Sequence, residues 1–246
     1  MGMAKIALVT GGNRGLGFEI ARQLAHAGAK VVIGARDPRR GGDAADLLRG
    51  EGLDAETVTL DVEDHASVEH ATRELEDRYG TLDVLVNNAG ILPEATADSR
   101  EVISTRLFRQ TFETNLFGAV STTEQLLPLL RRSEAGRIVN VSSTMGSLSD
   151  QSNPDSPYYE LPVPAYRASK AALNSITVGL AKSLADTPIK VNAVCPGSVQ
   201  TDLAPGQREQ APLTATDAAR VAVRYALVDD SGPSGRFFDR DGSVAW

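Results

Sequence analysis

Short apolar runs alternate with segments of helical periodicity along most of this chain. Short runs of Val, Ile, Leu and Ala are typical of strands that are buried on both faces. Between these runs, apolar residues recur every three or four positions, as in Leu16, Ile20 and Leu24, which predicts helices with one buried face. The runs predict strands at residues 5–9, 30–35, 55–60, 83–86, 137–141, 190–194 and 236–238.

Strands that alternate with helices build βα units, and their crossovers in a parallel sheet are right-handed. We therefore expect the α/β class, with residues 1–246 forming one Rossmann-type domain: a doubly wound parallel sheet of about seven strands with helices on both faces. The longest helical segment is predicted at about residues 105–130. Ligands of such sheets bind outside the carboxyl ends of the strands.

Two segments interrupt the alternation. Residues 147–164 contain four prolines and several Ser, Asn and Asp residues, and residues 201–212 contain two more prolines. Long irregular connections in compact domains often carry function. We expect both to be loops beside the site.

Composition restricts the possible functions. The 246 residues carry a net charge of -7, and the 25 basic residues are scattered along the chain, which argues against a nucleic-acid partner. Cys195 is the only cysteine and the three histidines lack metal-ligand spacing, so we expect no disulfide and no metal. No apolar run reaches the length of about 18 residues that a membrane span needs, and the first residues lack signal-peptide features. A cytoplasmic protein is expected.

The sequence TGGNRGLG follows the first predicted strand and precedes a helix, with glycines at Gly11, Gly15 and Gly17. Glycines allow a sharp turn and a close approach of a phosphate to the free N–H groups at a helix start. The spacing differs from the G-x-G-x-x-G fingerprint, but the position in the βα unit is that of a dinucleotide site.

The end of the second strand, GARDP, contains residues that point to both nicotinamide cofactors. An acidic residue there binds the ribose 2′-hydroxyl of NAD, whereas an arginine accommodates the 2′-phosphate of NADP. Asp37 precedes Pro38, which is the pattern of a helix N-cap and gives Asp37 a structural role. Arg36 and Arg14 then favour NADP(H), because a guanidinium pairs well with a phosphate. The alternative is that both arginines are only solvated.

Lys170 stands four positions after Tyr166, so on a helix the two residues face the same way. Nearby positive charges, from Lys170 and an oxidised nicotinamide, would lower the pKa of the Tyr166 phenol and make it a usable acid. A serine after the fifth strand would hold a carbonyl oxygen as charge develops. Both Ser142 and Ser143 stand there, and the pattern does not separate them.

Together these motifs resemble the short-chain dehydrogenase/reductase family. The matching segments are T-G-x-x-x-G-x-G, D-V, N-N-A-G, a helix Asn, S-S, Y-x-x-x-K and P-G, in this order along nearly the whole chain. The resemblance implies a catalytic set in which Tyr166 donates the proton, Ser143 orients the carbonyl, Lys170 also holds the nicotinamide ribose, and Asn115 anchors a water that relays protons. Asn87 is expected to tie the central strands together.

The resemblance also implies the residues that contact the cofactor. Asp61 would contact the adenine, and the P-G segment with the residues after it would hold the nicotinamide. With the glycine turn and the arginine argument included, the expected cofactor-binding residues are Gly11, Asn13, Arg14, Gly15, Leu16, Gly17, Arg36, Asp61, Val62, Asn88, Ala89, Gly90, Tyr166, Lys170, Pro196, Gly197, Val199 and Thr201.

Within the family the chain looks most like the carbonyl reductases, so we expect NADPH-dependent reduction of an aldehyde, ketone or quinone. NAD(P)+-dependent oxidation of a secondary alcohol is the alternative, and a nucleotide sensor without turnover is a third possibility. The insertion at 147–164 is shorter than in animal carbonyl reductases, where it leaves a monomer, so a homo-oligomer remains possible here. Tyr158, Tyr159 and Leu161 of the insertion would form either a substrate wall or a local cluster under a loop.

Overall fold

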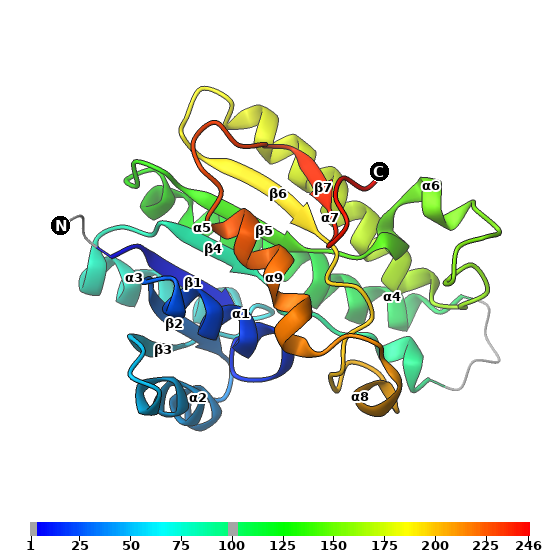
Figure 1. Ribbon diagram of the computed structural model, residues 1–246, viewed down its shortest axis with the longest axis horizontal. Coiled ribbons are helices and arrows are strands. Elements are labelled where there is room, and N and C mark those ends of the chain that lie inside the picture. Colours follow the sequence, from blue (N-terminus) through cyan, green and yellow to red (C-terminus); the bar gives the residue numbers. More distant parts are fainter. Residues whose placement is uncertain (1–3, 98–102) are drawn as a thin grey trace.

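The computed structural model describes residues 4–97 and 103–246. Seven strands form one parallel sheet in the order β3-β2-β1-β4-β5-β6-β7, which confirms the doubly wound fold (Figure 1). Each predicted strand is present; β1 and β4 begin and end one residue later than predicted, and β3 ends one residue earlier. The strands are β1 Ile6–Thr10, β2 Lys30–Ala35, β3 Ala55–Thr59, β4 Val84–Asn87, β5 Arg137–Val141, β6 Lys190–Val194 and β7 Arg236–Phe238.

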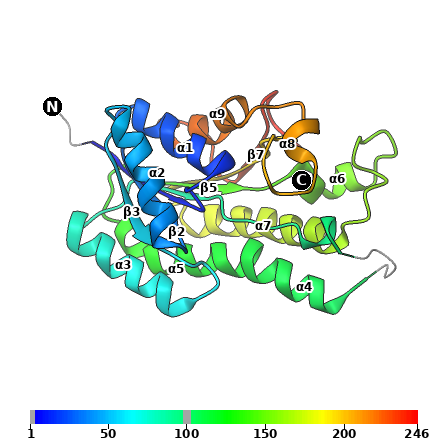
Figure 2. The ribbon, with the colours of Figure 1, turned by 90° about the horizontal axis from the view of Figure 1, so that it is seen from below.

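Helices cover both faces of the sheet, as the three layers of Figure 2 show. One face carries α1 Gly15–His26, α2 Pro38–Gly50 and α9 Ala215–Ala226. The other face carries α3 His65–Tyr79, α4 Thr105–Phe112, α5 Ala119–Leu130 and α7 Pro164–Ser183. Each face has its own apolar core: Val9, Ile20 and Leu24 belong to the first, and Leu8, Leu75 and Leu126 to the second. Burial of strand side chains on both faces explains the continuous apolar runs.

The order of the strands determines where a ligand can bind. The chain goes outward from β1 to β2 and β3, returns to the middle, and continues from β4 on the other side of β1. The connections after β1 and β4 therefore leave the sheet toward opposite faces and open a crevice at the carboxyl edge. The glycine turn follows β1 and the N-N-A-G segment follows β4, so the fold brings these two motifs to one crevice.

The helical segment predicted at 105–130 is present but is not a uniform α-helix. A π-helical segment, Glu113–Gly118, joins α4 to α5, and Pro128 lies inside α5. Insertions of this kind are uncommon and are often found at functional sites. Here the wider turn contains Asn115, which is almost completely buried.

The two segments expected to be loops are mostly irregular, and each contains one helical turn. Residues 147–164 include α6 Leu148–Gln151, and residues 201–212 include α8 Gln207–Gln210. Two short 3-10 turns, η1 Pro93–Ala95 and η3 Thr144–Gly146, follow β4 and β5 and lie at the same edge of the sheet. Within the described ranges, no helix combines the length and the apolar character needed to cross a bilayer.

Candidate active site

The glycine turn forms a cradle of backbone N–H groups at the start of α1. Gly11 and Gly15 have positive φ angles of 62° and 54°, which non-glycine residues rarely adopt. A Cβ atom on Gly17 would lie 2.4 Å from Asn88 Nδ2, so only glycine fits there. Arg14 is the N-cap of α1, and no side chain among the described residues caps this helix. The donors at this helix start therefore suit a pyrophosphate.

Residues after β4 fasten this cradle to the middle of the sheet. The backbone N–H groups of Asn88 and Ala89 both donate to Thr10 Oγ1 at 3.0 Å, and Asn88 Nδ2 donates to the Thr10 carbonyl at 2.9 Å. Asn87 Nδ2 donates to Asn140 Oδ1 at 2.9 Å and so links β4 to β5, which confirms its expected structural role. The two motifs that the fold brings to the crevice are thus held rigidly relative to each other.

At the far end of the cavity, Asp37 has the expected role of N-cap. Its Oδ1 accepts hydrogen bonds from the backbone N–H groups of Arg39 and Arg40 at 2.9 and 3.3 Å. Arg36 is exposed and lines the same cavity as Arg14. Arg14 also has a protein partner, because its Nη1 lies 3.5 Å from a carboxylate oxygen of Asp202. The cavity end is therefore rich in guanidinium groups.

Arg40 was not among the residues expected from the sequence, yet it lines this end of the cavity as well. It stands three positions after Asp37, in the first turn of α2, and its Nε is 3.6 Å from Asp37 Oδ2. The sequence signal for Arg40 was its position three residues after the N-cap Asp37, because residues three apart on a helix lie on the same side.

Asp61 and Val62 line the cavity directly after β3, as expected. The Asp61 backbone is held by Ser67, whose hydroxyl accepts from Asp61 N at 3.0 Å. Val62 packs so closely against Gly118 of the π-helical segment that a Cβ on this glycine would lie 2.8 Å from Val62 Cγ2. The structure thus joins the predicted adenine end of the site to the segment that contains Asn115.

Ser143 and Tyr166 converge at the other end of the cavity, after β5 and in the first turn of α7. The Ser143 hydroxyl is close enough to the Tyr166 phenol to act on its pKa. Ser143 Oγ also accepts from Met145 N at 3.2 Å. Ser142, the competing candidate, is turned into the protein, and its hydroxyl donates to Asn174 Oδ1 at 2.6 Å. The structure therefore separates the two serines: Ser143 faces Tyr166.

The pKa of Tyr166 differs from the sequence expectation. Burial raises the pKa of this phenol above its ordinary value, and the nearby Cys195 adds to the rise, while the nearby Ser143 hydroxyl opposes it. Within the protein itself, removal from water outweighs any effect of positive charge. The expected lowering by Lys170 is therefore not seen, and Tyr166 is a neutral acid at neutral pH.

Lys170 lies one helical turn after Tyr166 and is itself buried. Its Nζ donates to the Val141 carbonyl at 2.8 Å and lies 5.7 Å from the centre of the Tyr166 ring. Burial lowers the pKa of this ammonium group from its ordinary value to about 8. A group with this pKa is still mostly charged at neutral pH, so Lys170 presents a partly desolvated cation beside Tyr166.

Asn115 makes three hydrogen bonds that hold the neighbourhood of Tyr166. Its Oδ1 accepts from Ile91 N at 2.8 Å, and its Nδ2 donates to the Ile91 carbonyl at 3.0 Å and to Ser169 Oγ at 3.1 Å. The side chain therefore links the π-helical segment to the chain after β4 and to α7. Among the described residues, Asn115 and Lys170 form no direct hydrogen bond, and both side chains lie beside Gly90.

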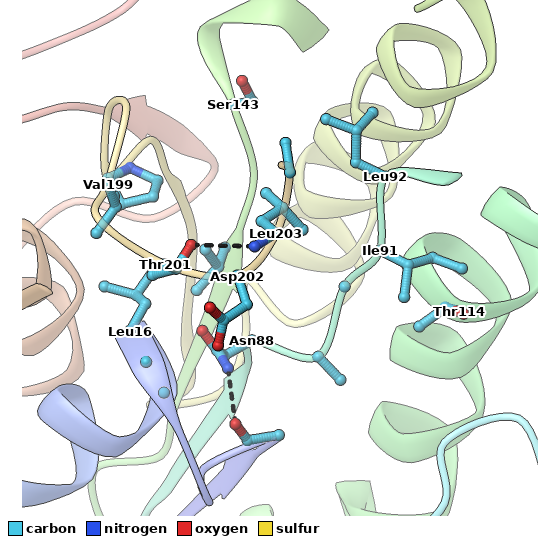
Figure 3. Close-up of a pocket in the computed structure, with 18 of the residues that line it drawn as sticks. Leu16, Asn88, Ile91, Leu92, Thr114, Ser143, Val199, Thr201, Asp202 and Leu203 are labelled. Carbon is cyan, nitrogen blue, oxygen red and sulfur yellow. Dashed lines mark hydrogen bonds between the residues drawn. The ribbon is translucent and has the colours of Figure 1, made fainter. Parts of the chain in front are cut away.

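The segment after β6 forms one wall of the cavity. Pro196, Gly197, Val199 and Thr201 all line it. Gly197 has a positive φ of 79°, and a bridge from Val199 to Leu213 stabilises the turn. Figure 3 shows that Val199, Thr201 and Leu203 of this segment and Leu92 of the chain after β4 face one pocket.

The whole cavity has a volume of about 610 Å³ and extends from the arginine cluster to Tyr166. Near Tyr166 it is bordered by side chains that are not part of the cofactor motifs. Within the insertion, Tyr158 and Leu161 line the cavity, whereas Tyr159 does not. The lining also includes Leu92, Met145, Leu203 and Gln210.

Comparison with known proteins agrees with this geometry. The family model for short chain dehydrogenases matches residues 5–212. The chain belongs to the short-chain dehydrogenase/reductase family. It is therefore an oxidoreductase that uses NAD(P) and acts on carbonyl or alcohol groups, and the glycine cradle fits such a dinucleotide.

Three relatives of this short-chain dehydrogenase/reductase illustrate the range of substrates. Salutaridine reductase of Papaver bracteatum is 34% identical over 96% of this chain and 94% of its own length. (+)-Neomenthol dehydrogenase of Arabidopsis thaliana is also 34% identical, over 96% of both chains. The structure of NADPH-bound carbonyl reductase from chicken fatty liver has a TM-score of 0.85, with 26% identity and complete coverage of both chains.

Proposed function

We propose that this protein is an NADPH-dependent carbonyl reductase that reduces an aldehyde, ketone or quinone. The observation that carries the proposal is the convergence of Ser143, Tyr166 and Lys170 at the end of the cavity that begins with the glycine cradle. A substrate carbonyl placed there would meet two hydroxyl donors, which is the arrangement that stabilises a developing oxyanion.

NADPH, when bound, would supply a hydride to the carbonyl carbon. As the C=O π bond breaks, negative charge develops on the oxygen, which accepts the Tyr166 proton. Ser143 donates a hydrogen bond to the same oxygen. Lys170 stabilises the phenolate that remains, because its positive charge is close and partly desolvated. Solvent then returns a proton to Tyr166.

The protonation state of Tyr166 in the protein without cofactor suits the first step of reduction. A phenol whose pKa is raised stays protonated at neutral pH, and a protonated tyrosine can donate. Oxidation of an alcohol is the reverse of the same reaction, so the preferred cofactor and its redox state determine the direction. The sensor alternative is less well supported, because binding alone requires neither the Ser143 hydroxyl nor its contact with Tyr166.

Two features support NADPH as the preferred cofactor. Asp37 uses its carboxylate to cap α2, so it is a poor partner for a ribose 2′-hydroxyl. Arg14, Arg36 and Arg40 border the same end of the cavity and would pair with a 2′-phosphate. The NADPH-bound carbonyl reductase of chicken, which shares the fold over its full length, agrees with this preference.

The substrate wall favours bulky, largely apolar carbonyl compounds. Leu92, Met145, Leu161 and Leu203 provide an apolar lining, and Tyr158 adds one hydroxyl for which the described residues offer no hydrogen-bond partner. Pockets of this kind fix a ligand by apolar contact and orient it with few polar groups. The relatives include proteins named salutaridine reductase and (+)-neomenthol dehydrogenase, which supports a carbonyl or alcohol substrate.

The proposal is tested by initial rates of NADPH and NADH consumption against matched carbonyl compounds. The panel contains cyclic terpenoid ketones, aromatic aldehydes, quinones and small polar ketones. We expect turnover that prefers NADPH and the larger apolar compounds. Consumption that prefers NADH would contradict the arginine argument, and binding of both cofactors without turnover of any compound would favour the sensor.

A further inference from the structure

The helix that carries Tyr166 begins without a capping side chain of its own. Its N-cap is Val163, whose side chain offers no acceptor, and its first residue is Pro164, which has no N–H. The first N–H groups that need an acceptor are therefore those of Ala165 and Tyr166. An uncapped helix start leaves such donors without partners and allows the first turn to fray.

Both of these N–H groups donate to one carboxylate from a distant part of the chain. Ala165 N lies 2.9 Å from Glu94 Oε1, and Tyr166 N lies 2.8 Å from Glu94 Oε2. Glu94 belongs to η1, in the connection after β4. A carboxylate at a helix N-terminus makes charge-assisted hydrogen bonds and interacts favourably with the helix dipole. Glu94 thus takes the place of the missing cap.

Tyr166 is held at its carbonyl group as well as at its amide. Ser169 Oγ donates to the Tyr166 carbonyl at 2.8 Å, and the same hydroxyl accepts from Asn115 Nδ2 at 3.1 Å. Asn115 also binds the backbone of Ile91, three residues before Glu94. A closed ring of hydrogen bonds therefore runs from Glu94 through Tyr166, Ser169 and Asn115 to Ile91 and back along the chain.

We propose that Glu94 is a positioning residue for Tyr166. It fixes the first turn of α7 and, with it, the backbone from which the tyrosine side chain extends. The ring also ties this turn to Leu92, which lines the substrate wall, so that the proton donor and the wall are fixed relative to each other. The inference rests on the proposed function for its kinetic consequence, but the capping contact is testable without any substrate.

The first test measures amide hydrogen exchange in the peptide that contains Ala165 and Tyr166, for wild type, Glu94→Ala and Glu94→Gln. The matched control is Glu124→Ala, which removes an exposed carboxylate from the outer side of α5. We expect exchange of this peptide to rise about tenfold or more in Glu94→Ala and less in Glu94→Gln, because glutamine keeps one acceptor oxygen. Unchanged exchange in Glu94→Ala would overturn the proposal.

The second test compares kcat, KM and the Kd of NADPH for the same variants with a carbonyl substrate that the wild type reduces. Misplacement of a reacting group by a fraction of an ångström lowers the rate of the chemical step, so we expect kcat to fall about tenfold in Glu94→Ala and about threefold in Glu94→Gln. KM and the Kd of NADPH should stay within about twofold of wild type. A purely structural role would instead lower thermal stability and leave kcat at the value of Glu124→Ala.

The two tests separate failure of this inference from failure of the proposed function. If the wild type reduces no carbonyl compound, the reductase proposal fails, and the exchange measurement still decides whether Glu94 holds the first turn of α7. If the wild type reduces carbonyl compounds and Glu94→Ala retains its kcat, the positioning role is refuted and the reductase remains.

Discussion

Substitution of Gly146 by alanine is expected to damage the site without touching a catalytic side chain. Gly146 ends η3, just after Ser143, and packs directly against the helix that carries Lys170. A Cβ atom on Gly146 would lie 2.6 Å from the backbone C and 2.8 Å from the Cβ of Lys170, and 2.9 Å from Ala171 N. Gly146 has no positive φ, so the added methyl group affects packing rather than backbone conformation.

The size of the effect follows from these distances. Ordinary carbon contacts lie at about 3.5–4.0 Å, so the turn and α7 must separate by roughly 1 Å. Overpacking of this kind costs about 1–3 kcal/mol, and the lower entropy of an unfolded chain with alanine offsets about 0.4–1 kcal/mol. We expect a net loss of about 1–2 kcal/mol, which corresponds to a fall in Tm of roughly 2–8 °C for a chain of this size. Because Ser143 and Lys170 move apart, kcat should fall about 10- to 100-fold.

A matched control lies on the same helix. Gly179 of α7 is exposed, and a Cβ there would have no atom within 4 Å. Gly179→Ala should therefore stabilise the protein by about 0.5–1 kcal/mol and leave kcat unchanged. Thermal and urea unfolding with steady-state kinetics of both variants provide the assay. A Gly146→Ala protein that is as stable and as active as Gly179→Ala would refute the packing argument.

Three further predictions concern the cofactor, pH and the central strands. Arg36→Ala should raise KM for NADPH about tenfold and leave KM for NADH within about twofold, because only NADPH has the 2′-phosphate; equal changes for both cofactors would contradict this. Burial lowers the pKa of Lys170 to about 8, below its unfolded value of 10.5, so the folded state loses this proton first as the pH rises. The difference in unfolding free energy between wild type and Lys170→Met, measured in urea, should therefore increase between about pH 8 and pH 10.5. A difference that stays constant over this range would disprove the lowered pKa of Lys170. Asn87→Ala leaves the buried side chains of Asn140 and Thr123 without a donor and should lower the unfolding free energy in urea by about 2–3 kcal/mol, whereas a loss below about 0.5 kcal/mol would show that the bonds are dispensable.

Local patterns in the sequence identified much of the fold and the cofactor cradle. The strands could be predicted because burial on both faces leaves a continuous apolar run, and the sequence Asp37-Pro38 identified an N-cap that the structure contains. The glycine turn was recognisable because its conformation excludes other residues. Each of these features is determined by residues that are close together in the sequence, so the sequence alone reveals it.

The missed features depend on contacts between distant segments. The sequence does not distinguish Ser142 from Ser143, because the hydrogen bond from Ser142 to Asn174 depends on how α7 packs against β5. The π-helical turn around Asn115 has no sequence signal of its own, and Glu94 meets the tyrosine helix across more than 70 residues. The raised pKa of Tyr166 likewise results from burial, which the spacing of Tyr166 and Lys170 does not reveal.

The central claim is that Tyr166 donates the proton during carbonyl reduction. The most direct measurement is the single-turnover rate of NADPH oxidation with a reducible ketone for wild type and Tyr166→Phe, with the Kd of NADPH determined for both proteins. Phenylalanine keeps the ring and removes only the hydroxyl, so we predict that the rate falls by at least about 100-fold while the Kd changes less than about threefold. A Tyr166→Phe protein that oxidises NADPH at a rate close to wild type would contradict the account.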